Sequence, residues 1–229
     1  MTTQRTRFSP DIAATHDGKI VSILGSSGVY RKQLKRLIDI ILVILAAPVV
    51  LPVIVLLCVM IVLRDGANPF YAQSRVGRHG RIFRMWKLRS MVKDADRRLE
   101  HHLRNNPEAR LEWDEKQKLT SDPRITSIGR VLRRTSLDEL PQLWNVFCGD
   151  MSLVGPRPMM PNQRSIYPGF TYYALRPGLT GYWQISDRHE SGFAARSQFD
   201  SRYFEDMSLT TDMSILKATV GVVFRGTGC

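Results

Sequence analysis

An uncharged apolar segment from Ile40 to Leu63 is the feature that most restricts how this chain folds. Its 24 residues suffice to cross a bilayer core of about 30 Å, which takes about 20 helical residues. Pro48 and Pro52 lie in its middle, and a proline removes a backbone donor and bends a helix. Both flanks are basic, with Arg31, Lys32, Lys35 and Arg36 before the segment and Arg64, Arg75, Arg78, Arg81 and Arg84 after it.

A spanning helix needs a positive flank on the cytoplasmic side only. The prolines and the two basic flanks therefore favour a re-entrant hairpin, which enters and leaves the membrane by the same face. A single kinked spanning helix is the alternative, because proline is common in membrane helices. No small-residue cleavage pattern follows the segment, so we do not expect a removable signal peptide.

The charge balance restricts the partners. The net charge is +12, from 33 Lys and Arg against 21 Asp and Glu, which predicts an anionic partner such as membrane lipid, a nucleotide or a nucleic acid. A nucleic-acid binder has no use for the apolar segment, so no nucleic-acid partner is expected. Cys58, Cys148 and Cys229 lie far apart in the sequence and match neither a disulfide framework nor a metal motif. A cytosolic location for the soluble part is the simplest interpretation.

The chain divides into three predicted parts: a mobile polar tail at 1–30, a membrane anchor at 31–64 and a cytosolic domain at 65–229. The predicted fold class is α+β, mostly helical. A β-hairpin is expected from Phe70–Val76 and Ile82–Met91, and helices from Met91–Lys118 with a break near Pro107, Ile128–Arg134, Phe193–Met207 and Leu209–Phe224. The last helix carries an apolar stripe that suits either a membrane interface or the core. Residues 151–182, rich in Pro and Gly, are expected to be largely irregular.

Asp138 and Glu139 are the candidate catalytic residues. Ser136 stands three residues before Glu139 in a capping-box pattern, so simple helix capping is the structural alternative. A helix N-terminus also binds anionic phosphate and keeps a carboxylate ionised. A carboxylate can serve as a nucleophile, a base or a Mg²⁺ ligand.

Basic residues supply candidates for phosphate binding. Seven lie in the segment from Arg75 to Lys93, which contains no acidic residue. The alternative for most of them is a lipid-facing surface, where each basic residue gains about 1 kcal/mol of attraction to anionic lipid. Lys87 and Arg89 share one face of the predicted strand, so we expect these two and Arg75 to contact phosphate. Prolines on both sides of Arg157 restrict its backbone and lower the entropy cost of holding it in place.

Two stretches of the sequence resemble the bacterial sugar transferase family: Leu-Asp-Glu-Leu-Pro-Gln at 137–142 and Gly-Asp-Met-Ser-Leu-Val-Gly-Pro-Arg-Pro at 149–158. The resemblance extends from Arg31 to Phe224 and is greatest to the monotopic phosphoglycosyl transferases that initiate exopolysaccharide synthesis. It implies transfer of a hexose 1-phosphate from a UDP-hexose, galactose or glucose, to undecaprenyl phosphate with release of UMP. It also implies a re-entrant helix-break-helix in the bacterial inner membrane, interfacial helices, and a catalytic domain that faces the cytoplasm. This chain departs in having Ala47 where relatives often have serine.

The resemblance further implies roles for single residues. Asp138 would attack the β-phosphate to form an aspartyl-phosphosugar, Glu139 would assist, and Arg157 and Arg176 would bind phosphate or nucleotide. Asp200 matches an acidic residue that lines the site, although a lone helix aspartate is more often a solvated charge. Ser186-Asp-Arg188 departs from the Asn-Gly-Arg of many relatives.

We expect dependence on Mg²⁺ or Mn²⁺ with Asp138 as the protein ligand, because a diphosphate donor needs its charge neutralised. We leave open two further partners, downstream glycosyltransferases and a second copy of the chain. The competing class is a non-enzymatic membrane-bound scaffold or regulatory protein that uses the basic surface. Release of UMP from UDP-hexose distinguishes the two.

Overall fold

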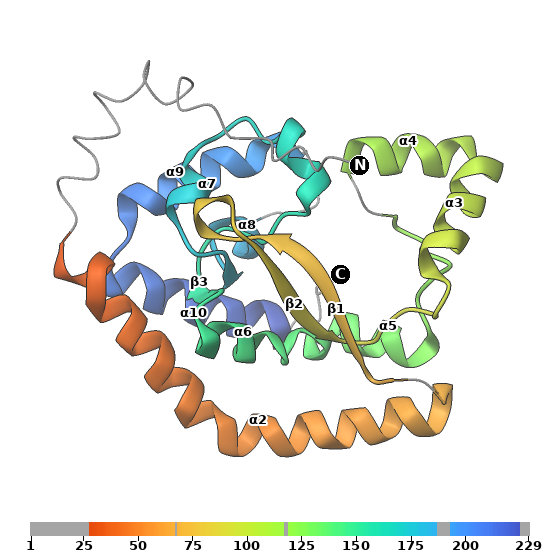
Figure 1. The fold of residues 1–229 in the computed structure, drawn as a ribbon, viewed down its shortest axis with the longest axis horizontal. Coiled ribbons are helices and arrows are strands. Elements are labelled where there is room, and N and C mark those ends of the chain that lie inside the picture. The colour runs from red at the N-terminus through yellow and green to blue at the C-terminus, as the bar shows by residue number, and fades with distance from the viewer. Residues whose placement is uncertain (1–27, 67, 117–118, 187–192, 225–229) are drawn as a thin grey trace, which may run out of the picture.

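A computed structural model describes residues 28–66, 68–116, 119–186 and 193–224. In this part of the chain helices dominate, accompanied by two separate two-stranded sheets, β1–β2 and β3–β4 (Figure 1). The predicted class, α+β and mostly helical, is therefore confirmed. The predicted tail lies, up to residue 27, outside the described residues.

The apolar segment forms one long helix, α2 (Lys35–Asp65), preceded by the short π-helical turn η2 (Tyr30–Leu34). The helix runs unbroken through Pro48 and Pro52 and is bent in the middle of its length, where the prolines lie (Figure 1). It ends at Gly66, whose φ of 57° gives the left-handed conformation that closes many helices. Of the described helices it alone is long and apolar enough to cross a membrane. The helix thus bends without a break, in place of the expected helix-break-helix.

Both arms of α2 pack against the same domain. On the N-terminal arm Val43 joins the main core with Phe83 and Val146, and on the C-terminal arm Leu57 and Ile61 pack with Leu88 and Leu132. The remaining faces of the helix expose large apolar side chains, among them Leu37, Ile41, Ile44, Leu45, Val49, Leu51, Val55, Leu56, Val59, Met60, Val62 and Leu63. A water-soluble protein buries such residues, so these faces need an apolar environment.

The predicted hairpin is confirmed. Strands β1 (Phe70–Val76) and β2 (Ile82–Leu88) pair antiparallel, with Tyr71 opposite Lys87, and the turn η3 (Arg78–Gly80) joins them. Strand β2 ends at Leu88, earlier than the predicted Met91, which instead forms an isolated bridge with Ile125. The hairpin crosses the middle of the molecule above α2 (Figure 1).

The helices after the hairpin follow their sequence signals. Helices α3 (Ala95–Asn105) and α4 (Pro107–Lys116) are separate, as the predicted break requires, because Pro107 is tolerated as the first residue of α4. They lie to one side of the hairpin, away from α7 and α9 (Figure 1). Helix α5 (Ser127–Arg134) starts at Thr126, whose side chain accepts a hydrogen bond from the Gly129 amide.

The predicted capping box at Ser136 is wrong. Ser136 has φ 57° and its side chain makes no capping hydrogen bond; a residue in this left-handed conformation differs from a capping residue, whose backbone is extended. The sharp turn at Ser136 starts a short 3₁₀ turn, η4 (Leu137–Glu139), and Pro141 then leads into α6 (Gln142–Cys148). Asp138 and Glu139 therefore lie on a tight turn between two helices.

Residues 151–182 contain more structure than predicted. Strands β3 (Ser152–Val154) and β4 (Gly178–Thr180) pair in parallel. The short elements η5 (Pro161–Ile166) and α7 (Thr171–Ala174) lie between them in the chain, and α8 (Tyr182–Ile185) follows β4. A Cβ added at Gly178 would lie 2.1 Å from the Gly155 amide nitrogen, so glycine is required there for the two loops to meet. This pairing needs residues distant in sequence, which local patterns do not reveal.

The last described elements are η6 (Phe193–Ala195), α9 (Arg196–Asp206) and α10 (Leu209–Phe224), so both predicted C-terminal helices are present. The apolar stripe of α10 divides between the two predicted environments. Leu216 packs against the main core, whereas Leu209, Met213 and Val220 are exposed.

Candidate active site

The acidic turn faces the hairpin. Lys87 Nζ on β2 donates a hydrogen bond to Glu139 Oε1 at 2.8 Å and lies 3.9 Å from Asp138 Oδ2. On the opposite side of the turn, Leu137 and Leu140 pack against the cluster that contains the C-terminal arm of α2. The Leu-Asp-Glu-Leu sequence thus places its two leucines against the cluster at the C-terminal arm of α2 and its two carboxylates beside Lys87.

Asn145 on α6 fixes the distance between the hairpin and the acidic turn. Its Nδ2 donates to Arg84 O at 2.8 Å and its Oδ1 accepts from Trp86 N at 3.0 Å. These two bonds satisfy backbone groups of β2 that do not pair with β1, in the residues just before Lys87. The side chain is almost fully buried, at 2% exposure, so the bonds form away from water, where unpaired backbone groups are costly.

Asp138 is buried, and burial raises the pKa of its carboxyl above the usual range. Lys87 opposes this effect, Glu139 adds to it, and the Arg133 guanidinium lowers the pKa as well. Burial is thus the largest influence on this pKa, and Asp138 lies on the 3₁₀ turn η4 and not in the first turn of an α-helix. Lys87 is the largest influence that favours the ionised form.

A pocket opens beside Lys87 and Glu139. Two predicted arginines, Arg75 from β1 and Arg157 from the loop after β3, line it together with Met85, Gln142, Pro158, Gly178 and Leu179. Gln142 belongs to the same sequence stretch as the acidic pair, and its Nε2 is buried without a hydrogen-bond partner in the described part of the chain. The structure therefore brings four predicted residues together: Arg75, Lys87, Glu139 and Arg157, with Asp138 alongside.

The arginines of the pocket are deeply placed. Arg75 donates to Pro158 O at 3.0 Å and to Gln73 Oε1 at 2.6 Å, while its Nε has no partner among the described residues. Burial, and next the charge of Arg157, lower the pKa of Arg75 to about 10, so it stays protonated at neutral pH. Two neighbouring guanidinium groups in a covered position are complementary to a multiply charged anion.

A third arginine, Arg196 at the start of α9, extends this cationic region. Its guanidinium carbon lies 4.2 Å from the ring centroid of Trp183 and 4.5 Å from that of Phe193, and Arg157 approaches Trp183 at 5.5 Å. Burial and then the charge of Arg157 lower the pKa of Arg196 to about 9. The sequence reasoning missed Arg196, because its contacts with Trp183 and Arg157 depend on the folding of other segments onto the start of α9.

Asp200 lies behind the arginines and does not line the pocket. It is buried, accepts a hydrogen bond from Tyr167 Oη at 2.6 Å and is attracted by Arg196. Burial raises the pKa of its carboxyl to about 7. Asp200 is therefore a negative counter-charge to Arg196 and not a residue of the pocket lining.

Two predicted phosphate ligands are placed elsewhere. Arg176 donates from Nε to Gly149 O at 3.0 Å, at the C-terminus of α6, where a cation also interacts favourably with the helix dipole. Arg89 follows the end of β2, and its backbone amide donates to Pro69 O at 2.7 Å. Neither side chain lines the pocket beside Lys87.

Comparisons with known proteins match residues 30–226 to the family described as bacterial sugar transferase. The chain belongs to the bacterial sugar transferase family. It is 48% identical over 197 residues to the UDP-galactose-lipid carrier transferase of Erwinia amylovora, and the match covers 85% of this chain and 41% of that protein. It is 45% identical over 197 residues to the undecaprenyl-phosphate galactose phosphotransferase of Salmonella typhimurium, again over 85% of this chain and 41% of the relative.

A third relative has a similar length. The exopolysaccharide production protein ExoY of Sinorhizobium fredii is 40% identical over 196 residues, which cover 85% of this chain and 87% of that protein. The chain thus spans about two fifths of the first two relatives and most of the third. The match covers 85% of this chain in all three comparisons.

Proposed function

We propose that this protein transfers a hexose 1-phosphate from a UDP-hexose, galactose or glucose, to undecaprenyl phosphate and so starts the assembly of an exopolysaccharide or related glycan. The observation that carries the proposal is the buried Asp138 beside Lys87 and Glu139, at the edge of a pocket lined by Arg75 and Arg157. The names of two relatives support the proposal: both contain galactose, and one names undecaprenyl phosphate while the other names a lipid carrier.

In the proposed first step, a carboxylate oxygen of Asp138 attacks the β-phosphorus of the donor. A bond from oxygen to phosphorus forms, the bond to the bridging oxygen breaks, and UMP leaves with that oxygen. Asp138 must be ionised to attack, and Lys87 at 3.9 Å favours the ionised form against the effect of burial. An aspartyl-phosphosugar remains on the enzyme.

In the second step, a phosphate oxygen of undecaprenyl phosphate attacks the same phosphorus. The acyl phosphate bond breaks, Asp138 regains its carboxylate, and the product is undecaprenyl diphosphate hexose. Glu139 holds Lys87 beside the reacting carboxylate through their 2.8 Å hydrogen bond. The two half-reactions predict ping-pong kinetics.

The arginines supply the charge that a diphosphate requires. Arg75 and Arg157 line the pocket, and the buried Nε of Arg75 is available for a ligand oxygen. Arg196 adds a third positive charge behind Trp183. Positioned guanidinium groups stabilise charge on a transferred phosphoryl group more effectively inside a covered site than in water.

A divalent cation fits the chemistry of this site. Mg²⁺ or Mn²⁺ takes one or two carboxylates together with substrate phosphates and water, so the Asp138 carboxylate would suffice as protein ligand. No three His, Cys, Asp or Glu side chains converge in the described ranges, as a cage made of protein ligands alone would require. When bound, the cation would neutralise part of the charge of the donor diphosphate.

We further propose that α2 is re-entrant, with the catalytic domain on the cytoplasmic face of the inner membrane, where nucleotide sugars are found. Both arms of α2 contact the same domain, which a straight spanning helix does not allow. The exposed Trp144 and Phe147 on α6, stacked on each other, and Met213 on α10 suit an interfacial position.

Single-cysteine labelling in spheroplasts tests this topology. Cysteine at Gln33, before the apolar segment, and at Glu100, after it, should both be inaccessible to an impermeant reagent from outside. Labelling of only one of the two positions would establish a spanning helix instead.

The activity is tested with purified protein, UDP-hexose and undecaprenyl phosphate. We expect UMP release that requires protein and an initial release before acceptor is added. A protein that binds anionic vesicles but releases no UMP would be the scaffold of the competing hypothesis. A scaffold does not require a buried carboxylate beside half-buried arginines, which is why we favour the enzyme.

A further inference from the structure

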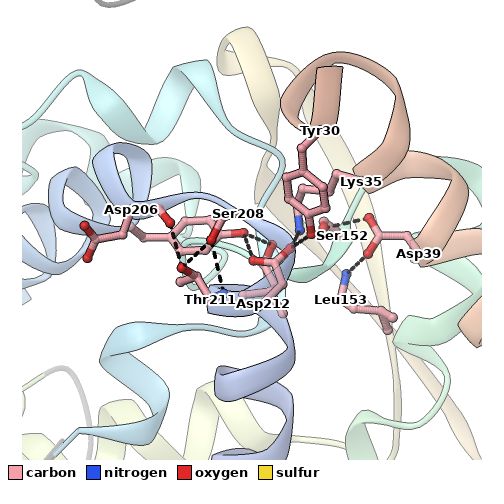
Figure 2. Close-up of polar contacts among 11 residues, drawn as sticks. Tyr30, Lys35, Asp39, Ser152, Leu153, Asp206, Ser208, Thr211 and Asp212 are labelled. Atoms are coloured by element: carbon pink, nitrogen blue, oxygen red, sulfur yellow. Dashed lines mark hydrogen bonds and ion pairs between the residues drawn. The ribbon is translucent and has the colours of Figure 1, made fainter. Parts of the chain in front are cut away.

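A second cluster of buried polar groups joins α2 to the C-terminal helix α10 (Figure 2). Asp212, in the first turn of α10, accepts hydrogen bonds from Tyr30 Oη at 2.6 Å, Lys35 Nζ at 2.6 Å and Tyr203 Oη at 2.7 Å. The exposed fractions of the Lys35 and Asp212 side chains are 12% and 7%, so the ion pair is largely shielded from water.

Helix α10 itself starts in a defined position. Ser208 Oγ accepts a hydrogen bond from the Thr211 amide, and Thr211 Oγ1 donates to Asp206 O at 2.7 Å (Figure 2). These bonds fix the first turn of the helix, where a carboxylate such as Asp212 is favoured by the helix dipole. The acceptor for Lys35 is therefore held rigidly.

A second carboxylate links α2 to the strand before the pocket. Asp39 accepts hydrogen bonds from Ser152 Oγ at 2.7 Å and from Leu153 N at 3.2 Å (Figure 2). Ser152 and Leu153 belong to β3, which ends at Val154, three residues before Arg157. We call Tyr30, Lys35, Asp39, Ser152 and Asp212 the anchor clamp.

The two arms of α2 are attached in different ways. Apolar side chains pack both arms against the domain, Val43 on the N-terminal arm and Leu57 and Ile61 on the C-terminal arm. The N-terminal arm has in addition the charged and hydrogen-bonded groups of the anchor clamp. Lipid tails are as apolar as leucine, so apolar packing alone gives a weakly fixed orientation next to a membrane. Buried polar bonds with defined geometry supply the orientation instead.

We propose that the anchor clamp fixes the position of the pocket relative to the membrane and thereby serves the second half-reaction, attack by the lipid-linked phosphate. This inference rests on the proposed function. The donor is soluble in water and reaches Asp138 whatever the orientation of the domain. The acceptor phosphate is tethered to the bilayer, so it reaches Asp138 only when the domain has the correct orientation. Tyr30, Lys35 and Asp212 are thus positioning residues.

The test separates the two half-reactions. Lys35→Met removes the charge but keeps the length of the stem, and Tyr30→Phe removes one hydrogen bond with little effect on packing. For each variant we measure the single-turnover release of UMP without acceptor, and kcat/KM for undecaprenyl phosphate in vesicles and for a short-chain, water-soluble polyprenyl phosphate. Asp94→Asn, which breaks the exposed Asp94–Arg98 pair on α3, is the matched control.

We expect Lys35→Met to lower kcat/KM for undecaprenyl phosphate by about tenfold or more, with a smaller loss for Tyr30→Phe. UMP release in the first half-reaction should stay within about twofold of the wild type, and the loss should be smaller with the short-chain acceptor. Lys35→Arg, which keeps the charge, should restore activity in part.

Wild-type acceptor kinetics in both Lys35→Met and Tyr30→Phe would overturn the inference. So would an equal loss in both half-reactions of the milder Tyr30→Phe variant, because that result indicates a general structural role. Absence of UMP release from the wild-type protein would overturn the proposed function instead, and the inference with it.

Discussion

Replacing Asn145 by leucine should disconnect the hairpin from the acidic turn. Asn145 pairs Arg84 O at 2.8 Å and Trp86 N at 3.0 Å, and leucine has a similar volume but neither a donor nor an acceptor. Two backbone groups of β2 then lose their partner while leucine still shields them from water. Leaving one buried polar group unpaired costs about 1–3 kcal/mol, so the substitution should lower the free energy of unfolding by about 2–5 kcal/mol.

Thermal unfolding of purified protein in one detergent measures this effect. For a domain of this size, 1 kcal/mol corresponds to about 2–4 °C, so the midpoint should fall by roughly 4–20 °C. Asn145→Asp keeps the acceptor for Trp86 but loses the donor to Arg84, and it should have an intermediate effect. Asn105→Leu on the exposed face of α3 is the remote control and should change stability by less than about 0.5 kcal/mol.

The same substitution should slow the reaction at temperatures where the protein remains folded, because Lys87 follows the released part of β2. An Asn145→Leu protein whose midpoint lies within about 2 °C of the wild type would refute this reasoning. It would mean that packing of the hairpin, and not these two hydrogen bonds, places Lys87 beside the carboxylates.

Three further predictions concern charge. Lys87→Met removes the main influence that lowers the pKa of Asp138, so the acid limb of the pH profile of kcat/KM should move to higher pH. An unmoved limb would show that Lys87 does not affect the ionisation of the reacting carboxylate. Asp200 has a pKa raised to about 7, so its contribution to stability is present at low pH and is lost as the pH rises through about 7. Asp200→Asn should therefore reduce the difference in unfolding midpoint between pH 5 and pH 8, and an unchanged difference would contradict the buried position. Excess EDTA should abolish activity and added Mg²⁺ or Mn²⁺ should restore it, whereas activity that survives chelation would remove the metal from the mechanism.

Local sequence patterns predicted most of the fold. The hairpin, the break at Pro107 and the last two helices follow from residues close together in the chain. The pairing of β3 with β4 was not predictable in this way, because it depends on backbone contact between glycines in two separated loops, such as Gly155 and Gly178.

The candidate site was predicted in part. Sequence patterns and the family resemblance together named Asp138, Glu139, Lys87, Arg75 and Arg157, and the structure brings them together. Three features escaped prediction for a physical reason. Asp138 is buried where its turn packs beside β2, which comes from a distant part of the sequence.

Arg196 was missed for a similar reason, since only the folded chain places it between Trp183 and Phe193. Asn145 gave no signal either, because an asparagine in a helix shows its partners only when the neighbouring strand edge is in place. A lone polar residue within the apolar run at 143–148 is the sequence feature that could have drawn attention to it.

The nucleophilic role of Asp138 is tested most directly by Asp138→Asn and the single-turnover release of UMP from UDP-hexose. Asparagine keeps the size of the side chain, and Glu139 still pairs with Lys87, so the protein should fold with an unfolding midpoint close to that of the wild type. We predict that UMP release falls by at least about 10³-fold, equivalent to about 4 kcal/mol of barrier. A well-folded Asp138→Asn protein that releases UMP at a near-normal rate would show that this carboxylate does not attack the donor.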